Sequence, residues 1–411
     1  MKHYIFLFII LSIFSSCSAR ETNSKLIKEP ESIRIPSKLI LGCENINDYW
    51  YLIDNKKVAL VVNQTSIFSN KIHIVDSFAR QNIQIKKIFA PEHGFRGTAD
   101  AGASISNQID TKTGIPIISL YGSKVKPSKE DLAGIEVVVF DIQDVGARFY
   151  TYISTMYYVM QACAENKIKI VILDRPNPNG YYVDGPVLDI KYKSFVGKLP
   201  IPIVHGCTIG ELAHMINEEG WLGADLKCEL TVSSCKNYMH RMQYSLPINP
   251  SPNLRTDRAI MLYPSLCMFE ATEVSVARGT DFPFEAIGSP FALKSKTDYS
   301  FMPKSRPGAT SPPFKDKICY GYNLRLDEFT EDVSYGTINL SYLIRMYNAF
   351  GENKLKFFHT DGFFEKLAGN DELKEQIIQG LSEKEIKATW QEELSMYKEM
   401  RKKYLLYPDF E

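Results

Sequence analysis

The fold is decided by one stretch in the middle of the chain, EVVVFDIQDVGAR at residues 136–148. Its first seven residues are almost continuously apolar, which predicts a strand buried on both faces, as in a parallel sheet that helices cover on either side. The residues that follow are mostly polar or small. Ligands of open parallel sheets bind beyond the carboxyl ends of the strands, so we expect a functional site at this edge.

Four other apolar runs of the same kind lie along the chain on either side of this one. Helix-like segments at 72–80, 128–132 and 152–166 separate them, so the pattern is a repeated strand–helix–strand series. We therefore predict a parallel, doubly wound α/β domain over residues 36–240. The other predicted strands are 57–62, 83–90, 115–120 and 169–173.

The chain changes character after residue 240. Residues 246–313 are rich in proline, glycine and aromatic side chains and predict long structured loops, whereas helical periods dominate from Tyr335 onward. Ser382 and Glu385 form a capping box, which predicts a helix over about 383–404. We expect a second, smaller α/β or α+β domain at residues 241–411.

The composition is that of a globular protein and argues against one class of partner. A chain of 411 residues has the length of roughly two to three domains. Its 48 basic residues balance its 48 acidic residues, so the formal net charge is zero. Because such a chain has no overall field to hold a polyanion, nucleic acid is not an expected partner.

The amino-terminal segment has the pattern of an export signal. An apolar run at 4–14 follows Lys2 and ends in small residues before Cys17. This predicts a signal peptide over 1–16, a lipidated Cys17 and a polar tether over 17–35. The only expected membrane contact is this lipid, at the periplasmic face of a membrane or at the cell surface. A plain signal peptide or an uncleaved anchor are the alternatives.

Polar residues follow five predicted strands, and Glu92 is the most suggestive of them. It lies between Pro91 and Gly94, beside His93, at the end of the strand 83–90. A carboxyl group that is partly removed from water at such a position can act as a general acid. A helix cap or a salt bridge with Arg96 is the alternative for Glu92, and turn formation is the alternative for the asparagine, aspartate, glycine and proline residues at these strand ends. Those other strand-end candidates are Asn63, Tyr121, Asp144 and Arg148.

Several motifs bear on other kinds of chemistry. The sequence GCTIG at 206–210 resembles a nucleophile elbow, so an esterase that uses His205 and Cys207 is an alternative function. Thr208 and Glu211 also form a capping box, which predicts a helix start instead. His205 is in addition a candidate for substrate contact. The chain has no glycine-rich phosphate motif and no metal-ligand spacing, so we expect no cofactor and no metal.

Long strings of the sequence, in order from about Leu41 to Pro408, resemble one known family, the NamZ-type exo-β-N-acetylmuramidases. These are bacterial glycosidases that act on peptidoglycan and were formerly known as a domain of unknown function. The strings are VVNQTS (61–66), FAPEHGFRG (89–97), GIPIISLYG (114–122), FDIQDVGARFYTYISTM (140–156), LDRPNPNG (173–180), NPSPNL (249–254), YPSLCMFEATEVSVARGTDFPFEAIGSPF (263–291) and KYLLYP (403–408).

The resemblance implies both an architecture and an activity. The architecture is a Rossmann-like domain joined to a second α/β domain, with the active cleft between them. The activity is release of N-acetylmuramic acid from the non-reducing end of peptidoglycan fragments such as MurNAc-GlcNAc, in cell-wall turnover and recycling. Glu92 matches the catalytic acid of the family motif, and Glu270 is the second acidic position carried over. The chain has Ala271, Glu273, Ala277 and Phe291 where the resemblance implies glycine, asparagine, glycine and a tryptophan or tyrosine.

The chemistry of such a substrate suggests roles for the other candidates. Glycoside hydrolysis commonly uses one protonated carboxyl group and one charged group, and retaining, inverting and substrate-assisted routes all stay open. The lactyl carboxylate of muramic acid requires a cation, for which Arg148 and Arg278 are candidates. A non-catalytic lipoprotein that binds muropeptides is a further alternative. The remaining expected substrate contacts are Asn63, His93, Tyr121, Asp144, His205, Asn253 and Glu273.

Overall fold

The computed structural model describes residues 38–96, 100, 108–325 and 336–411. Residues 38–411 form one compact unit, and a domain boundary near residue 240 stays a prediction. The predicted signal peptide, Cys17 and nearly all of the tether lie outside the described residues. Within the described part of the chain, no helix has the length and apolar character needed to cross a membrane.

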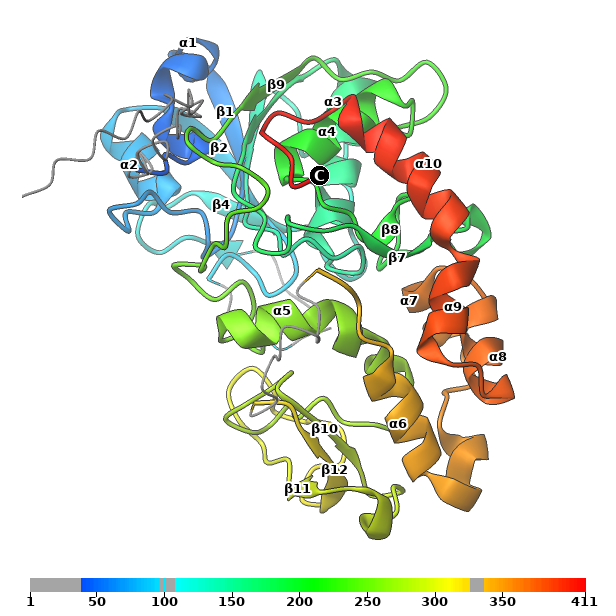
Figure 1. Ribbon diagram of the computed structural model, residues 1–411. Coiled ribbons are helices and arrows are strands. Elements are labelled where there is room, and N and C mark those ends of the chain that lie inside the picture. The colour runs from blue at the N-terminus through cyan, green and yellow to red at the C-terminus, as the bar shows by residue number, and fades with distance from the viewer. Residues whose placement is uncertain (1–37, 97–99, 101–107, 326–335) are drawn as a thin grey trace, which may run out of the picture. The chain divides into compact units, whose positions relative to one another are not determined.

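A seven-stranded sheet forms the first part of this unit (Figure 1). Its strand order is β3-β4-β2-β1-β5-β6-β9, and only β3 at the edge runs antiparallel to its neighbour. The chain adds strands on one side of β1 and then on the other, so the strand order reverses between β1 and β5. The strands are β1 (Lys57–Val62), β2 (Gln84–Ala90), β3 (Gln108–Ile109), β4 (Pro116–Ser119), β5 (Val137–Asp141), β6 (Lys169–Leu173) and β9 (Leu230–Ser233).

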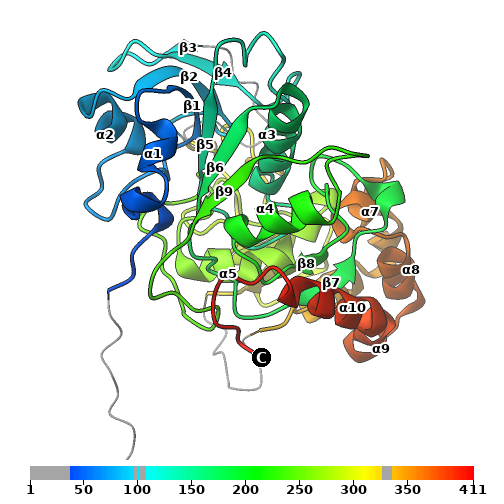
Figure 2. The same cartoon turned by 90° about the horizontal axis from the view of Figure 1, so that it is seen from above.

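Helices cover both faces of this sheet, as Figure 2 shows for α1 and α2 on one side and α3 and α4 on the other. Alternate residues of β1 consequently enter two separate cores: Leu60 packs on the side of α1 and α2, and Val61 on the side of α3 and α4. The prediction of a doubly wound sheet is therefore confirmed. The helices are α1 (Trp50–Ile53), α2 (Ile74–Arg80), α3 (Tyr152–Asn166) and α4 (Ile209–Glu218).

The second part of the unit combines a small antiparallel sheet with helices. The three strands have the order β10-β12-β11, and a separate two-stranded hairpin of β7 and β8 precedes them in the chain. This is the predicted α+β character. The hairpin strands β7 (Asp184–Val187) and β8 (Pro202–Val204) belong to the first part of the chain. The elements of the second part are α5 (Asp257–Leu266), β10 (Ala286–Ser289), β11 (Tyr299–Phe301), β12 (Cys319–Asn323), α6 (Ser341–Ala349), α7 (Phe363–Ala368), α8 (Glu372–Gln379), α9 (Glu383–Thr389) and α10 (Gln391–Lys402).

Two predicted helices differ from those observed. Residues 128–132 form turns, because the i to i+4 bond from the Leu132 amide to the Ser128 carbonyl is not continued and Gly134 takes a left-handed φ of 72°. The predicted helix 383–404 is divided into α9 and α10 at Trp390, whose φ is −104° and ψ 5°. Its predicted start is correct, because the Ser382–Glu385 capping box forms.

Candidate active site

A cavity of about 710 Å³ lies beyond the carboxyl ends of β2 and β4. The first part of the chain supplies one wall, which includes Glu92, Tyr121 and Thr151. The second part supplies the opposite wall, which includes Glu270 and Arg278. A pocket of this volume has the size of a small-molecule site, and its place at the strand ends is the one that the fold favours.

Glu92 lies on a tight turn directly after β2. The Gly94 amide donates to the Pro91 carbonyl at 3.0 Å, and His93 and Gly94 both take left-handed φ values, of 68° and 77°. A left-handed φ is costly for a residue with a side chain, and such strain is concentrated at functional sites. The turn fixes the direction in which Glu92 leaves the strand, and His93, largely buried, lines the cavity with it.

Two hydroxyl groups hold the Glu92 carboxyl group in place. Thr151 Oγ1 donates to Glu92 Oε2 at 2.7 Å. The Tyr121 hydroxyl also bonds to Glu92; burial, with the charge of Glu92, raises the pKa of Tyr121 above its ordinary value. Both donors come from strand-end segments, Tyr121 after β4 and Thr151 just before α3. The orientation of the carboxyl group is therefore set before any substrate binds.

Glu270 and Arg278 form an ion pair on the opposite wall. Glu270 Oε1 accepts from Arg278 Nε at 2.7 Å and lies 2.6 Å from Nη2. Burial alone would lower the pKa of Arg278, but the charge and hydrogen bond of Glu270 outweigh it and raise the pKa. Arg278 is presented on a tight turn between Ala277, with φ 60°, and Gly279, with φ 81°. The left-handed Ala277 explains why glycine is expected at this position in the family.

A third pair, Glu273 and His359, also lines the cavity. Short pairing between the two segments brings them together: the Glu273 amide donates to the Phe357 carbonyl and the His359 amide to the Ala271 carbonyl. His359 Nε2 lies 3.8 Å from Glu273 Oε1. His359 could not be predicted as a site residue, because nothing in its local sequence indicates this long-range pairing. Thr151 was also missed, although it lies inside one of the strings shared with the family.

Five predicted substrate contacts lie outside the described lining of the cavity. Their side chains are buried and support the surrounding backbone, so the expectation that they contact substrate has no geometric support here. Asn63 Oδ1 accepts from the Thr65 amide, Asp144 Oδ2 accepts from the Gly146 amide, His205 Nδ1 accepts from the Cys207 amide, Asn253 Nδ2 donates to the Gly308 carbonyl, and Arg148 donates to four backbone carbonyls.

The prediction that Arg148 binds the lactyl carboxylate does not fit the observed position of its side chain. Its guanidinium group is 1 % exposed and donates to the carbonyls of Pro186, Ile201, Leu367 and Ala368 at 2.7 to 2.9 Å. A side chain with these bonds braces the β7–β8 hairpin against α7, and it is not among the described residues that line the cavity. Of the two predicted arginines, Arg278 is the one placed to meet a substrate carboxylate.

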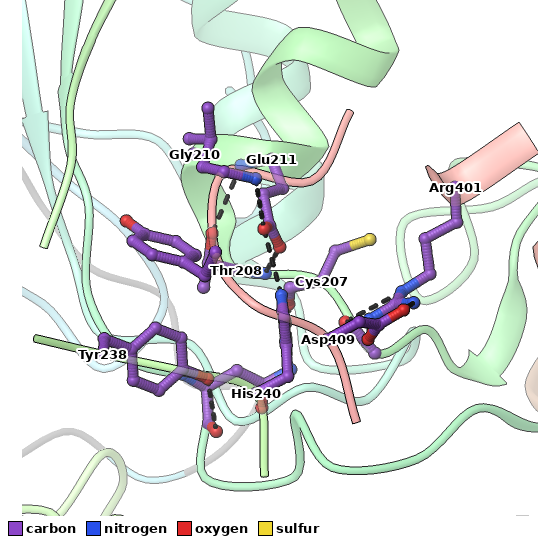
Figure 3. Close-up of polar contacts among 12 residues, drawn as sticks. Cys207, Thr208, Gly210, Glu211, Tyr238, His240, Arg401 and Asp409 are labelled. Carbon is purple, nitrogen blue, oxygen red and sulfur yellow. Dashed lines mark hydrogen bonds and ion pairs between the residues drawn. The ribbon is translucent and has the colours of Figure 1, made fainter. Parts of the chain in front are cut away.

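The geometry around Cys207 does not fit the esterase alternative. The thiol is 1 % exposed, and burial raises its pKa to about 12, so it is held as a neutral thiol. Figure 3 shows its surroundings, where Thr208 and Glu211 cap α4 as the sequence predicted. Glu211 also lies 3.0 Å from His240, inside the same buried polar cluster. These residues stabilise a helix start and leave no exposed nucleophile.

No cluster of three or more histidine, cysteine, aspartate or glutamate side chains suited to a metal ion occurs among the described residues. Each of the seven described cysteines is a free thiol. The cavity instead offers a fixed glutamate on one wall and a glutamate–arginine pair on the other. Two carboxyl groups on opposite walls of one cavity are the arrangement that most glycoside hydrolases use.

Comparison with known proteins gives the particular family. Residues 58–258 match the family described as "Exo-beta-N-acetylmuramidase NamZ, N-terminal", and residues 261–407 match its C-terminal counterpart. The chain is 36% identical to "Peptidoglycan beta-N-acetylmuramidase NamZ" of Bacillus subtilis (strain 168), over 99% of this chain and 100% of that protein. The chain therefore belongs to the NamZ exo-β-N-acetylmuramidase family, as its sequence motifs indicated.

Two solved structures share this fold, both described as DUF1343 family proteins from Bacteroides fragilis NCTC 9343. One is 48% identical, with a TM-score of 0.82, and covers 91% of this chain and 100% of its own. The other is 26% identical, with a TM-score of 0.77, and covers 90% of this chain and 99% of its own. The predicted α/β architecture is confirmed by these likenesses as well as by the strand order.

Proposed function

We propose that this protein is an exo-acting glycoside hydrolase that releases N-acetylmuramic acid from the non-reducing end of peptidoglycan fragments. Family membership and the muramidase relative support the reaction class. The observation that carries the assignment is the position of Glu92, which two hydroxyl groups fix at a strand end inside the cavity. A glycosidase needs a carboxyl group held in this way beside the bond that it breaks.

Glu92 acts as the general acid in this proposal. Thr151 holds one carboxyl oxygen and so fixes the plane of the group, which then faces the glycosidic oxygen of a bound substrate. Proton donation to that oxygen lets the bond from C1 break and the leaving sugar depart as a neutral alcohol. A water molecule then supplies the hydroxyl group at C1 of the released N-acetylmuramic acid and gives up a proton, which restores the acid. Glu270, on the opposite wall, supplies the second carboxylate of the site.

Arg278 binds the lactyl carboxylate, the group that distinguishes muramic acid from glucosamine. Its contacts with Glu270 use Nε and Nη2, and Nη1 carries two further donors. Glu270 thus keeps the guanidinium group in a fixed orientation while its outer edge receives a second carboxylate. Planar guanidinium groups suit this kind of recognition better than lysine does.

The test compares two substrates of the purified soluble domain, a chromogenic β-N-acetylmuraminide and the matching N-acetylglucosaminide. The muraminide should be cleaved and the glucosaminide almost ignored. Arg278→Met should reduce kcat/KM for the muraminide by roughly 30-fold or more, the loss typical of a largely buried charged contact, and should reduce the glucosaminide rate much less. Equal turnover of the two substrates by the wild type would contradict the specificity. Binding of muropeptides without cleavage would identify a binding protein instead.

We also propose that the protein is an exported lipoprotein that reaches its wall fragments from a membrane surface. The support is the sequence alone: the apolar run at 4–14 and the small residues before Cys17. Cys17→Ala should move the protein from the membrane fraction to the soluble fraction of the cell. If the variant still sediments with membranes, lipid at Cys17 is not the anchor.

A further inference from the structure

Three aromatic side chains lead away from Glu92 along one side of the cavity. We name Tyr121, Phe195 and Tyr158 the aromatic shelf. The ring centres of Tyr121 and Phe195 lie 5.8 Å apart, and those of Phe195 and Tyr158 lie 6.4 Å apart with only 16° between the ring planes. Tyr121 and Phe195 line the cavity, and all three side chains are partly exposed.

Two lysines, which we name the lysine pair, end the shelf on the side away from Glu92. Lys198 Nζ lies 4.1 Å from the ring centre of Tyr158 and donates to its hydroxyl at 2.7 Å. Lys193 and Lys198 both approach the ring of Tyr157, at 5.3 and 4.8 Å. Burial, together with the charge of Lys198, lowers the pKa of Lys193.

Among the described residues no ion pair involves Lys193 or Lys198, although most of the ion pairs elsewhere in the described chain contain a lysine. Two like charges held close together repel one another, and that repulsion is relieved when an anion binds between them. The surface at the end of the shelf is therefore complementary to a negatively charged group.

The loop that carries these residues is held firmly. Ser154 Oγ on α3 donates to the Phe195 carbonyl at 2.6 Å, and the Ser194 amide donates to the Gly197 carbonyl at 2.9 Å. A Cβ atom at Gly197 would come within 2.8 Å of Leu188, so the turn packs closely on the protein body. A surface fixed in this way loses little conformational entropy when it binds.

We propose that the aromatic shelf and the lysine pair bind the part of the glycan that lies beyond the scissile bond. The shelf packs against the leaving N-acetylglucosamine, and the lysine pair binds the lactyl carboxylate of a second N-acetylmuramic acid. This inference rests on the proposed function, since it takes Glu92 as the general acid. The acid must touch the leaving oxygen, so the leaving sugar lies beside Tyr121, the first ring of the shelf.

The spacing of charge along the glycan agrees with this assignment. In a strand of alternating sugars, the leaving N-acetylglucosamine is uncharged and the next carboxylate belongs to the second sugar beyond the bond. The protein presents the same order, with uncharged rings next to Glu92 and the lysine pair after them. A substrate of three or more sugars therefore gains a contact that the disaccharide MurNAc-GlcNAc cannot make.

Two trisaccharides that differ by one lactyl group provide the test, MurNAc-GlcNAc-MurNAc and MurNAc-GlcNAc-GlcNAc. The wild type should cleave the first with a kcat/KM about two- to fivefold higher, the range expected for partly exposed ion pairs, and added salt should reduce that ratio. The double variant Lys193→Met/Lys198→Met should bring the ratio to about one. The matched control Lys169→Met/Lys227→Met removes two lysines near the amino ends of β6 and β9 and should keep the wild-type ratio.

The shelf has its own test, because Phe195→Ala should raise KM for the disaccharide several-fold at an unchanged melting temperature. A wild type that cleaves both trisaccharides equally, or a lysine-pair variant that keeps the preference, overturns the charged contact. An unchanged KM for Phe195→Ala overturns the shelf. A preference that arises only when a peptide is attached to the third sugar overturns the lactyl assignment in favour of peptide carboxylates. If the wild type cleaves no muraminide, the proposed function fails and this inference falls with it.

Discussion

Thr151 shows how one side chain can serve the site at the expense of its own helix. It is the N-cap of α3, a position where threonine normally accepts a hydrogen bond from an amide of the first turn. Here its side chain makes no capping bond and donates to Glu92 instead. The helix forgoes a contribution of about 1 kcal/mol to stability, and the catalytic carboxyl group gains a fixed orientation.

Replacement of Thr151 separates this positioning role from a structural one. Thr151→Val keeps the shape of the side chain but removes the hydroxyl, so it should lower kcat for the disaccharide roughly tenfold, since the misplaced acid loses part of its effect. The melting temperature should hardly change, because no cap is lost. Thr151→Ser restores the hydroxyl and should recover most of the activity. If valine and serine behave alike, the hydroxyl does not position Glu92.

Glu92→Gln tests the general acid directly. General acid catalysis is typically worth about 10²–10⁴-fold in rate, so hydrolysis of MurNAc-GlcNAc should fall by at least about 100-fold. An activated aryl leaving group needs less protonation, and the variant should keep relatively more activity on an aryl muraminide. Kinetics on both substrates, with a melting curve as the control, measure this difference. Equal losses on the two substrates would show that Glu92 is not chiefly the leaving-group acid.

Among the secondary-structure elements, the features that depend on neighbouring residues, such as helix starts, could be predicted from the sequence. The capping boxes at Thr208–Glu211 and Ser382–Glu385 both form, because each needs only residues three positions apart. The break at Trp390 has a distant cause, since its Nε1 donates to Asp184 Oδ1 in the β7–β8 hairpin at 3.3 Å. The helical periodicity of the sequence around Trp390 does not indicate this contact, so the break could not be predicted.

In the candidate site, too, the features set by neighbouring residues could be predicted and those set by distant contacts could not. Strand ends could be predicted from apolar runs, and Glu92 and Tyr121 do line the cavity at two of them. Asp144 and Arg148 also follow the end of β5, yet their side chains are buried and bond with backbone groups. The sequence indicates which edge of the sheet is polar, but the direction of each side chain depends on turns and partners far along the chain.

Asp174, at the end of β6, accepts hydrogen bonds from the start of α4, and its protonation makes the stability of the fold depend on pH. It accepts hydrogen bonds from Thr208 Oγ1 and the Gly210 amide at the start of α4, and from the Tyr407 hydroxyl. Burial, with the charge of Glu211, raises the pKa of Asp174 to about 6, although these hydrogen bonds oppose the shift. In the unfolded chain the same group loses its proton near pH 3.8. The folded state therefore binds more protons between these two pH values.

The linkage predicts a loss of stability as pH rises through that window. The contribution of Asp174 to the free energy of unfolding should fall by about 3 kcal/mol between roughly pH 4 and pH 6. Asp174→Asn cannot titrate, so the difference in unfolding free energy between wild type and variant should decrease by that amount. Denaturant titrations at pH 4, 5, 6 and 7 measure it. A difference that stays constant with pH would show that Asp174 is ionised throughout.

At the scale of the whole unit, long-range polar contacts tie late segments of the chain to early ones. Figure 1 shows the carboxyl-terminal segment after α10 passing back beside α4. Arg401 secures it, donating to the Gly206 carbonyl and pairing with Asp409 through two contacts of 2.8 Å (Figure 3). Arg148 makes a second tie, between the segment after β5 and α7. The two walls of the cavity therefore depend on contacts outside the cavity for their relative position.

Replacement by methionine should therefore affect different properties at the two arginines: stability at Arg148 and substrate specificity at Arg278. Arg148→Met leaves four buried carbonyls without their donor, and an unsatisfied buried polar group costs about 1–3 kcal/mol. We expect a loss of at least about 3 kcal/mol in the free energy of unfolding, after allowing for the cost of burying the charge. The space is specific to arginine, since Gly369 packs against the guanidinium so closely that a Cβ atom there would lie 2.5 Å from Nη2.

The comparison needs two measurements on each variant, the unfolding free energy and the ratio of muraminide to glucosaminide turnover. Arg148→Met should lose stability while the folded fraction keeps the wild-type ratio, because the side chain braces the walls without lining the cavity. Arg278→Met should lose the ratio while its stability changes less, because inside the protein it loses the ion pair with Glu270 and the ring contact with Phe284 and leaves no set of four carbonyls without a donor. A contrary result would be an Arg148→Met variant that is as stable as the wild type but has lost the preference for the muraminide. In that case Arg148 binds the substrate carboxylate, and its side chain takes a different position when substrate is bound.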